Sequence, residues 1–101
     1  MNNYEAVFIF GANLDNDAQE KLVNEIKEVI TKNKGEVEDV QTWGKRKFTF
    51  LINKQSEGIY YLVLFKLTAA AVKKIEGIFK LNDSILRVLI IRRESKARKN
   101  G

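Results

Sequence analysis

Thr42-Trp-Gly-Lys-Arg-Lys-Phe-Thr-Phe-Leu-Ile-Asn-Lys54 is the stretch from which the rest of this 101-residue chain can be interpreted. Its Trp43-Gly44 pair is typical of a bulge or bend in a strand. The alternation that follows places Phe48, Phe50 and Ile52 on one side of that strand. The thirteen residues contain four cations and no acid. A segment that anchors a core with one face and presents cations beside it suits contact with a polyanion.

The flanking sequence alternates between strand and helix patterns. Period-two alternation predicts strands at residues 4–10, 59–67 and 85–92. Residues 36–41 are expected to be extended, but Val37 and Val40 are out of phase with Phe48, Phe50 and Ile52, so this remaining strand should have a bulge or bend near Trp43-Gly44. Asn53 to Gly58 is expected to be a polar loop.

Apolar residues at helical spacing predict a first helix over residues 15–34 and a second that starts after Thr68 and ends before Leu81. Asp15 and Asp17 are typical helix-start residues, and Asp17 and Glu20 have the spacing of a capping box at the start of the first helix. Gly35 would supply the left-handed residue that ends it.

The order strand, helix, strand, strand, helix, strand predicts an α+β fold of the ferredoxin-like βαββαβ type. This is a four-stranded antiparallel sheet with both helices on one face. Right-handed crossovers place the first and third strands in the centre. Residues 1–92 would form this single domain, and residues 93–101, which lack an apolar pattern, would form a basic flexible tail.

The sheet face without helices is expected to be apolar, although an open antiparallel face is normally polar. Six aliphatic residues should point to it: Val7, Ile9, Leu62, Leu64, Leu89 and Ile91. Such a patch usually marks a contact site. Shielding by long Lys and Arg stems is the alternative interpretation, and the pattern alone leaves both open.

The composition excludes several kinds of site. There is no Cys and no His, so disulfides, thiolate metal sites and the commonest acid/base at neutral pH are all missing. The apolar runs are far below membrane-spanning length, and a cytoplasmic protein without catalytic residues, metal or cofactor is expected. The net charge of +5 is local, because residues 92–101 hold five cations and one acid.

Four groups of residues carry a resemblance to a known family. A short polar lead precedes Tyr4-Glu5, and residues 44–52 resemble a signature of Gly, any residue, a cation, a polar residue, Leu, a small residue, Tyr, any residue and Ile. Gly44, Arg46 and Ile52 fit it directly, whereas Phe48 replaces the Leu and Thr49 replaces the usual Ala or Ser. Phe50 stands where the signature has Tyr, so an RNA contact made by that hydroxyl is not carried over. The other matches are Trp43, Lys54, Gly58, Tyr60 and the closing residues 85–92.

Over essentially its whole length the chain therefore resembles bacterial small-subunit ribosomal protein six. The resemblance implies a structural component of the 30S subunit that binds the central domain of 16S rRNA. It also implies a heterodimer with small-subunit ribosomal protein eighteen. No enzymatic activity, small-molecule substrate or membrane contact is implied, and the location would be the cytoplasmic ribosome.

Candidate RNA contacts are Tyr4 and six cations: Lys45, Arg46, Lys54, Arg87, Arg92 and Arg93. Tyr4 could be a base-stacking platform or an ordinary residue at the edge of the core. The three cations at 45–47 could contact phosphates or deter sheet-to-sheet aggregation, and the resemblance favours RNA contact for Arg46. Arg87, Arg92 and Arg93 could line one groove with Tyr4, because the first and last strands should be neighbours.

Candidate contacts with the protein partner are Trp43, Val7, Ile9, Tyr60, Leu62, Leu64, Leu89 and Ile91. Trp43 has two interpretations, a packing anchor for the bend or a stacking residue, and the first is favoured. Two other functions compete with the leading one. A stand-alone RNA-recognition module needs exposed aromatic residues on the central strands, where only Tyr60 would serve. An acylphosphatase-type enzyme needs an Arg before the first helix, where residues 11–14 contain none.

Overall fold

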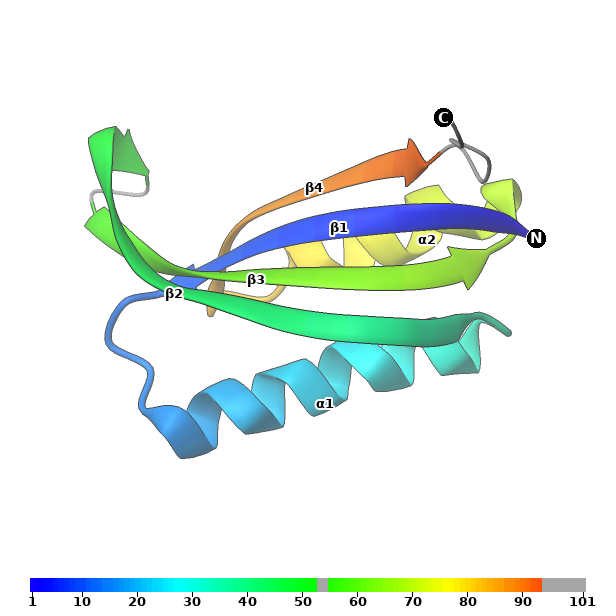
Figure 1. Cartoon of the computed structure of the whole chain (residues 1–101), viewed down its shortest axis with the longest axis horizontal. Helices are drawn as coiled ribbons and strands as arrows, with labels where there is room; N and C mark the ends of the chain where they lie inside the picture. The colour runs from blue at the N-terminus through cyan, green and yellow to red at the C-terminus, as the bar shows by residue number, and fades with distance from the viewer. Residues whose placement is uncertain (53–54, 94–101) are drawn as a thin grey trace, which may run out of the picture.

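The computed structural model of the chain describes residues 1–52 and 55–93, apart from the side chains of residues 50–52. The described part confirms the predicted order of elements (Figure 1): β1 (Asn2–Gly11), α1 (Asn16–Lys32), β2 (Glu36–Ile52), β3 (Gln55–Leu67), α2 (Ala69–Lys80) and β4 (Ile85–Arg93). Lys54 and residues 94–101 of the predicted tail lie outside the described residues, while Arg93 belongs to β4.

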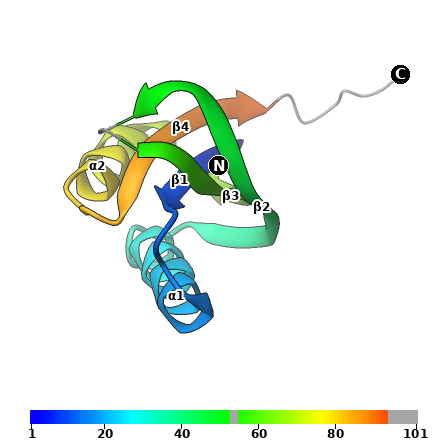
Figure 2. The same cartoon turned by 90° about the vertical axis from the view of Figure 1, so that its left-hand side faces the viewer.

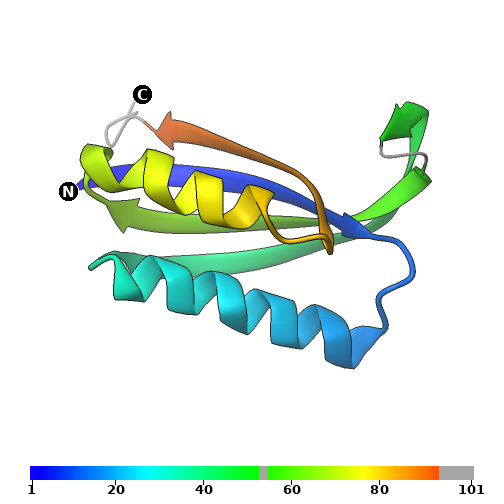
Figure 3. The ribbon, with the colours of Figure 1, turned by 180° about the vertical axis from the view of Figure 1, so that it is seen from behind.

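The sheet has the order β2-β3-β1-β4 and every neighbouring pair is antiparallel. The predicted placement of the first and third strands in the centre is therefore confirmed. Both helices cover the same face, as the view from behind shows (Figure 3). The opposite face, called the open face below, carries no helix.

The hydrophobic core lies between the helices and the covered face of the sheet. Alternate residues of β1 and β3 point into it and are fully buried: Ala6, Phe8, Phe10, Val63, Phe65 and Leu67. The helices contribute their predicted apolar stripes, with Ile26, Ile30, Ile75 and Phe79 buried. Phe8 meets Phe79 edge-on with ring centroids 5.0 Å apart, a favoured aromatic geometry.

The start of α1 is fixed by Asp15. Its side chain accepts a hydrogen bond of 2.8 Å from the amide of Ala18, which satisfies one of the free donors of the first turn. Of the two residues predicted to start this helix, Asp15 is therefore the N-cap. The predicted capping box of Asp17 and Glu20 is wrong, because Asp17 lies inside the first turn. Thr68 is the N-cap residue of α2, as predicted, although its side chain makes no capping hydrogen bond.

The β2–β3 hairpin curls out of the plane of the sheet, as seen end-on in Figure 2. The pairing of the two strands shifts register between Thr42 and Gly44, and Gly44 is left-handed with φ 79°. The predicted bulge near Trp43-Gly44 is thus confirmed. The predicted loop of residues 53–58 is too long, because β3 already begins at Gln55 and extends the hairpin.

The end of α1 corrects the role predicted for Gly35. The left-handed residue is Lys34, with φ 68°, while the amide of Gly35 donates to the carbonyl of Ile30 at 2.9 Å. Gly35 is needed for space instead. A Cβ atom there would lie 2.7 Å from the carbonyl oxygen of Lys66 and 2.8 Å from Cγ2 of Ile30. The glycine therefore lets the chain leave α1 pressed against the end of β3.

Replacing Gly35 by Ala should lower the free energy of unfolding by about 1–3 kcal/mol, because the backbone carbonyl of β3 cannot move aside. The matched control is Gly77→Ala, at a helical position in α2 where an added Cβ meets nothing within 4 Å. That change should raise stability by about 0.5–1 kcal/mol. Chemical denaturation measures both, and equal effects of the two substitutions would contradict the close packing at Gly35.

Candidate nucleic-acid interface

A row of open-face positions crosses all four strands at the base of the hairpin. Tyr60 of β3 pairs with Gly44 of β2 on one side and with Ile9 of β1 on the other, and Ile9 pairs with Arg87 of β4. Trp43, next to Gly44 in the bulge, lies nearly parallel to Tyr60, with ring centroids 6.5 Å apart and planes at 12°. Trp43, Tyr60, Ile9 and Arg87 are called the cross-strand row below.

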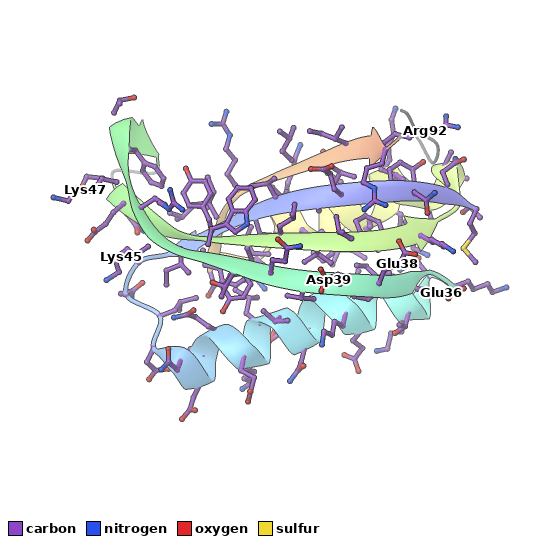
Figure 4. All side chains as sticks on the ribbon, viewed as in Figure 1. Glu36, Glu38, Asp39, Lys45, Lys47 and Arg92 are labelled. Carbon is purple, nitrogen blue, oxygen red and sulfur yellow. The ribbon has the colours of Figure 1, made fainter. Side chains whose placement is uncertain are left out.

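The three consecutive cations of β2 divide between the two faces. Arg46 pairs with Gly58, and its Nε donates to the carbonyl of Trp43 at 3.3 Å, so its side chain turns back toward the row. Lys45 and Lys47 alternate with it and extend from the hairpin end of the molecule (Figure 4). All three are exposed, as is Arg87, and none of these four forms an ion pair within the described residues.

The charge of β2 reverses along its length. Its first half presents three exposed acids, Glu36, Glu38 and Asp39, at the end of the strand far from Lys45 and Lys47 (Figure 4). Only Glu38 of these acids has a cationic partner in the described part of the chain, Lys66 at 3.6 Å. This acidic half was not predicted as a functional feature, although its three acids lie within a few residues of the acid-free stretch.

The apolar part of the open face lies beside the acidic half of β2. Val7 pairs with Leu62 on one side and Leu89 on the other. Leu89 and Ile91 are 54% and 45% exposed. Together with Leu64 these residues form what is called the apolar patch: Val7, Leu62, Leu64, Leu89 and Ile91. Five of the six aliphatic residues expected on this face are therefore at least partly exposed, although Glu5 pairs with both Leu64 and Ile91 in the middle of the patch. The use of the patch by a partner stays a prediction.

Ile9 departs from the expectation for the apolar face. It points to the open face but is only 6% exposed, and it does not belong to the core between sheet and helices. A Cβ added at Gly58 would meet both Ile9 and Phe48, which shows that the curled hairpin brings Phe48 toward Ile9. Ile9 is therefore covered by the hairpin and offers little surface to a partner.

Tyr4 occupies the second of its two proposed positions, the edge of the core. Its ring is 5% exposed, faces the helices and stacks on Phe65 with centroids 5.7 Å apart. A ring buried in this way has no free face for a nucleobase. The predicted role as a stacking platform is therefore corrected to a packing role.

The structure also separates the arginines that were expected to line one groove. Arg92 and Arg93 pair with Tyr4 and Asn3 at one end of β1, whereas Arg87 pairs with Ile9. Five residues of strand separate Arg87 from Arg92, about 17 Å. Arg92 donates to the side-chain oxygen of Asn2 at 3.2 Å, at the end of the sheet away from the hairpin (Figure 4). Arg87 therefore joins the hairpin cations, and the predicted groove does not form.

Among the described residues, no group of three or more His, Cys, Asp or Glu side chains is placed to hold a metal ion. No helix of that part of the chain is both long and apolar enough to cross a membrane.

Residues 3–92 match the sequence model of the family described as ribosomal protein S6. The chain belongs to the ribosomal protein S6 family. It is 46% identical to small ribosomal subunit protein bS6 of Clostridium acetobutylicum over 91 residues, which cover 90% of this chain and 96% of that protein. Its identity to the bS6 protein of Clostridium novyi is 37% over 94 residues, 93% of this chain and 99% of that protein.

The fold of this S6-family chain also matches a solved structure of the family. The crystal structure of 30S ribosomal protein S6 from Thermotoga maritima superimposes with a TM-score of 0.85 at 30% identity. The match covers 91% of this chain and 87% of that one. The family resemblance and the ferredoxin-like fold expected from the sequence are therefore confirmed, and the chain is a ribosomal protein of the small subunit.

The packing role of Tyr4 has a direct test in stability. Tyr4→Ala should lower the free energy of unfolding by about 3–5 kcal/mol, as expected when a buried aromatic side chain is removed. Tyr4→Phe keeps the ring and loses a long contact of 3.4 Å with Asn2, so the change should stay below about 1 kcal/mol. Thermal unfolding followed by circular dichroism measures both. A Tyr4→Ala protein of unchanged stability would contradict burial of the ring.

Proposed function

We propose that this S6-family chain is a non-catalytic structural constituent of the 30S subunit that binds the central domain of 16S rRNA together with small-subunit ribosomal protein eighteen. The observation that carries the proposal is the division of the open face into two chemically different parts. The hairpin end has cations without ion-pair partners in the described residues. The other end has the apolar patch bordered by acids.

The hairpin end suits RNA for electrostatic reasons. Arg87 ends the cross-strand row and Arg46 lies beside Trp43 at its other end. Lys45 and Lys47 extend from the hairpin end of the molecule. Cations without acidic partners keep their charge available for phosphates, and their contacts release counterions. Guanidinium groups can contact a phosphate through two hydrogen bonds or lie flat on a base. Lys54 belongs to the same predicted set but lies outside the described residues.

The apolar patch suits a protein partner. Leu89 and Ile91 are about half exposed, with Val7 paired to Leu89 and Glu5 paired to Ile91. Exposed apolar patches usually mark protein contacts. Glu36, Glu38 and Asp39 border the face along β2 and would repel phosphates. A basic protein with apolar side chains complements both features, which supports a ribosomal protein as partner on this half.

RNA binding should depend on Arg46 and Arg87, the two arginines at the ends of the cross-strand row. Arg46→Gln combined with Arg87→Gln should weaken binding of an rRNA central-domain fragment by the chain and its partner. The slope of log affinity against log salt should fall by about 2, because each phosphate contact contributes about one counterion. Filter binding or fluorescence anisotropy at several salt concentrations measures this.

Lys73→Gln combined with Lys74→Gln is the matched control, since it removes the same charge from exposed positions of α2. If this control reduced affinity and salt slope as much, RNA would not bind at the hairpin end. If the unaltered chain with its partner bound no rRNA fragment at low salt, the proposed function itself would be wrong.

Partner binding should depend on the exposed members of the apolar patch. Leu89→Ser combined with Ile91→Ser should weaken heterodimer formation about tenfold or more, because central apolar contacts dominate such interfaces. Stability should change little, since both side chains are already about half exposed. Isothermal titration calorimetry without RNA gives the affinity. Leu81→Ser, at an 84% exposed residue after α2, is the control and should leave it unchanged.

A further inference from the structure

We propose that Trp43 is a stacking platform for one unpaired nucleobase, an inference that rests on the RNA-binding function proposed above. The ligand would be a base that is splayed out of a helix, such as one in a bulge, loop or junction. Bases inside a duplex are stacked on their neighbours and have no face to offer, so only an unpaired base can lie on a protein ring. Trp43 is exposed on the open face whereas the ring of Tyr4 is buried, so this role is assigned to Trp43.

The indole of Trp43 has a rigid support. Its plane lies on Tyr60 at 12°, and Tyr60 in turn contacts Phe48, with ring centroids 6.2 Å apart. Beneath them Ile9 is 6% exposed and holds the base of the cluster. Trp43 is nevertheless 45% exposed, and Tyr60 is the only ring in the described part of the chain that packs on it. The indole is therefore backed by Tyr60, and nearly half of the surface of Trp43 remains exposed for a ligand.

The backbone holds this arrangement before any ligand arrives. Gly44 takes the left-handed conformation that an L residue rarely adopts, and its amide donates to Oγ1 of Thr42 at 3.3 Å. Arg46 donates to the carbonyl of Trp43. The indole thus sits on a bulge whose geometry is set by local hydrogen bonds. A ligand that stacks there has less conformational entropy to remove from the protein.

The charges around Trp43 favour a nucleic acid over a protein side chain as its ligand. Arg46 donates a hydrogen bond to the carbonyl of Trp43, and Arg87 lies at the far end of the cross-strand row. Neither forms an ion pair in the described residues. The acids of β2 lie at the opposite end of the strand (Figure 4). Aromatic rings interleaved with free cations are the pattern of single-stranded nucleic-acid sites, in which stacking and phosphate contacts act together.

The test uses the fact that Trp43 is the sole tryptophan of the chain. An rRNA central-domain fragment is titrated into the full chain with its protein partner, and the Trp43 signal is the difference from the same complex made with Trp43→Phe. Stacking should quench this fluorescence at the RNA concentrations that give binding. Trp43→Phe keeps an aromatic ring and should bind RNA within about threefold of the unaltered chain.

Trp43→Leu removes the aromatic face but keeps an apolar side chain. It should weaken RNA binding by roughly 5- to 150-fold, the range that corresponds to one stacked base. Thermal unfolding verifies that the variant is folded, and heterodimer formation without RNA should be unaffected. Leu81→Ala serves as a control for loss of exposed apolar surface elsewhere.

Three results would overturn the inference, and they differ in what else they overturn. If the unaltered chain binds RNA and Trp43→Leu binds equally well, Trp43 does not stack and the RNA-binding function stands. If Trp43→Leu instead weakens the heterodimer without RNA, Trp43 contacts the protein partner. If the unaltered chain with its partner binds no rRNA fragment, the proposed function fails together with this inference.

Discussion

The change of register between β2 and β3 at Thr42 and Gly44 is the constraint on which the surface of this protein depends. Because side chains of a strand alternate between faces, one extra residue in β2 changes the face of everything that follows it. Gly44 permits the extra residue by adopting φ 79°. Trp43 then stacks on Tyr60, and the hairpin curls toward the open face. Without the bulge, the cations after Gly44 would exchange faces.

The two faces of the sheet are consequently stabilised in different ways. The helical face is closed by a continuous core in which Phe8, Phe10 and Phe65 are fully buried. On the open face, the packed cluster that the described side chains form is small, and it consists of Ile9, Phe48, Trp43 and Tyr60 at the hairpin base. Changes in the core should therefore affect the whole fold, whereas changes in this cluster should chiefly affect the position of the hairpin.

The fold was predictable because each of its elements carries its own periodic signal. Ala6, Phe8 and Phe10 alternate in sequence and are all fully buried, and the stripe of α2 contains Ile75 and Phe79 as expected. Positions set by tertiary contact were not predictable. Gly35 has the sequence context of a helix stop, but Lys34 takes the left-handed conformation and Gly35 is held close to β3. That approach depends on a strand thirty residues later in the chain.

The candidate site shows the same division between local and long-range information. The cations at 45–47 and the bulge were predictable from the sequence, because both are features of consecutive residues. The burial of Ile9, the inward ring of Tyr4 and the separation of Arg87 from Arg92 depend on how strands curve and pair. The stack of Trp43 on Tyr60 joins residues seventeen positions apart across a bulge, and alternation rules do not predict which ring faces which.

Two features of the isolated chain are unfavourable in water or leave charge unpaired. Their positions support the proposed contacts with RNA and with a protein partner. Half-exposed Leu89 and Ile91 keep apolar surface in water, while Arg46 and Arg87 keep charges without ion-pair partners in the described residues. Sequences tend to break local rules of stability where they meet a ligand. Here the two kinds of exception lie in adjoining parts of one face, since Arg87 pairs with Ile9 and Leu89 pairs with Val7. They require different chemistry, negative charge in one case and apolar contact in the other. A single occupant of uniform character would satisfy only one of them, so we infer two macromolecular neighbours that meet across the cross-strand row.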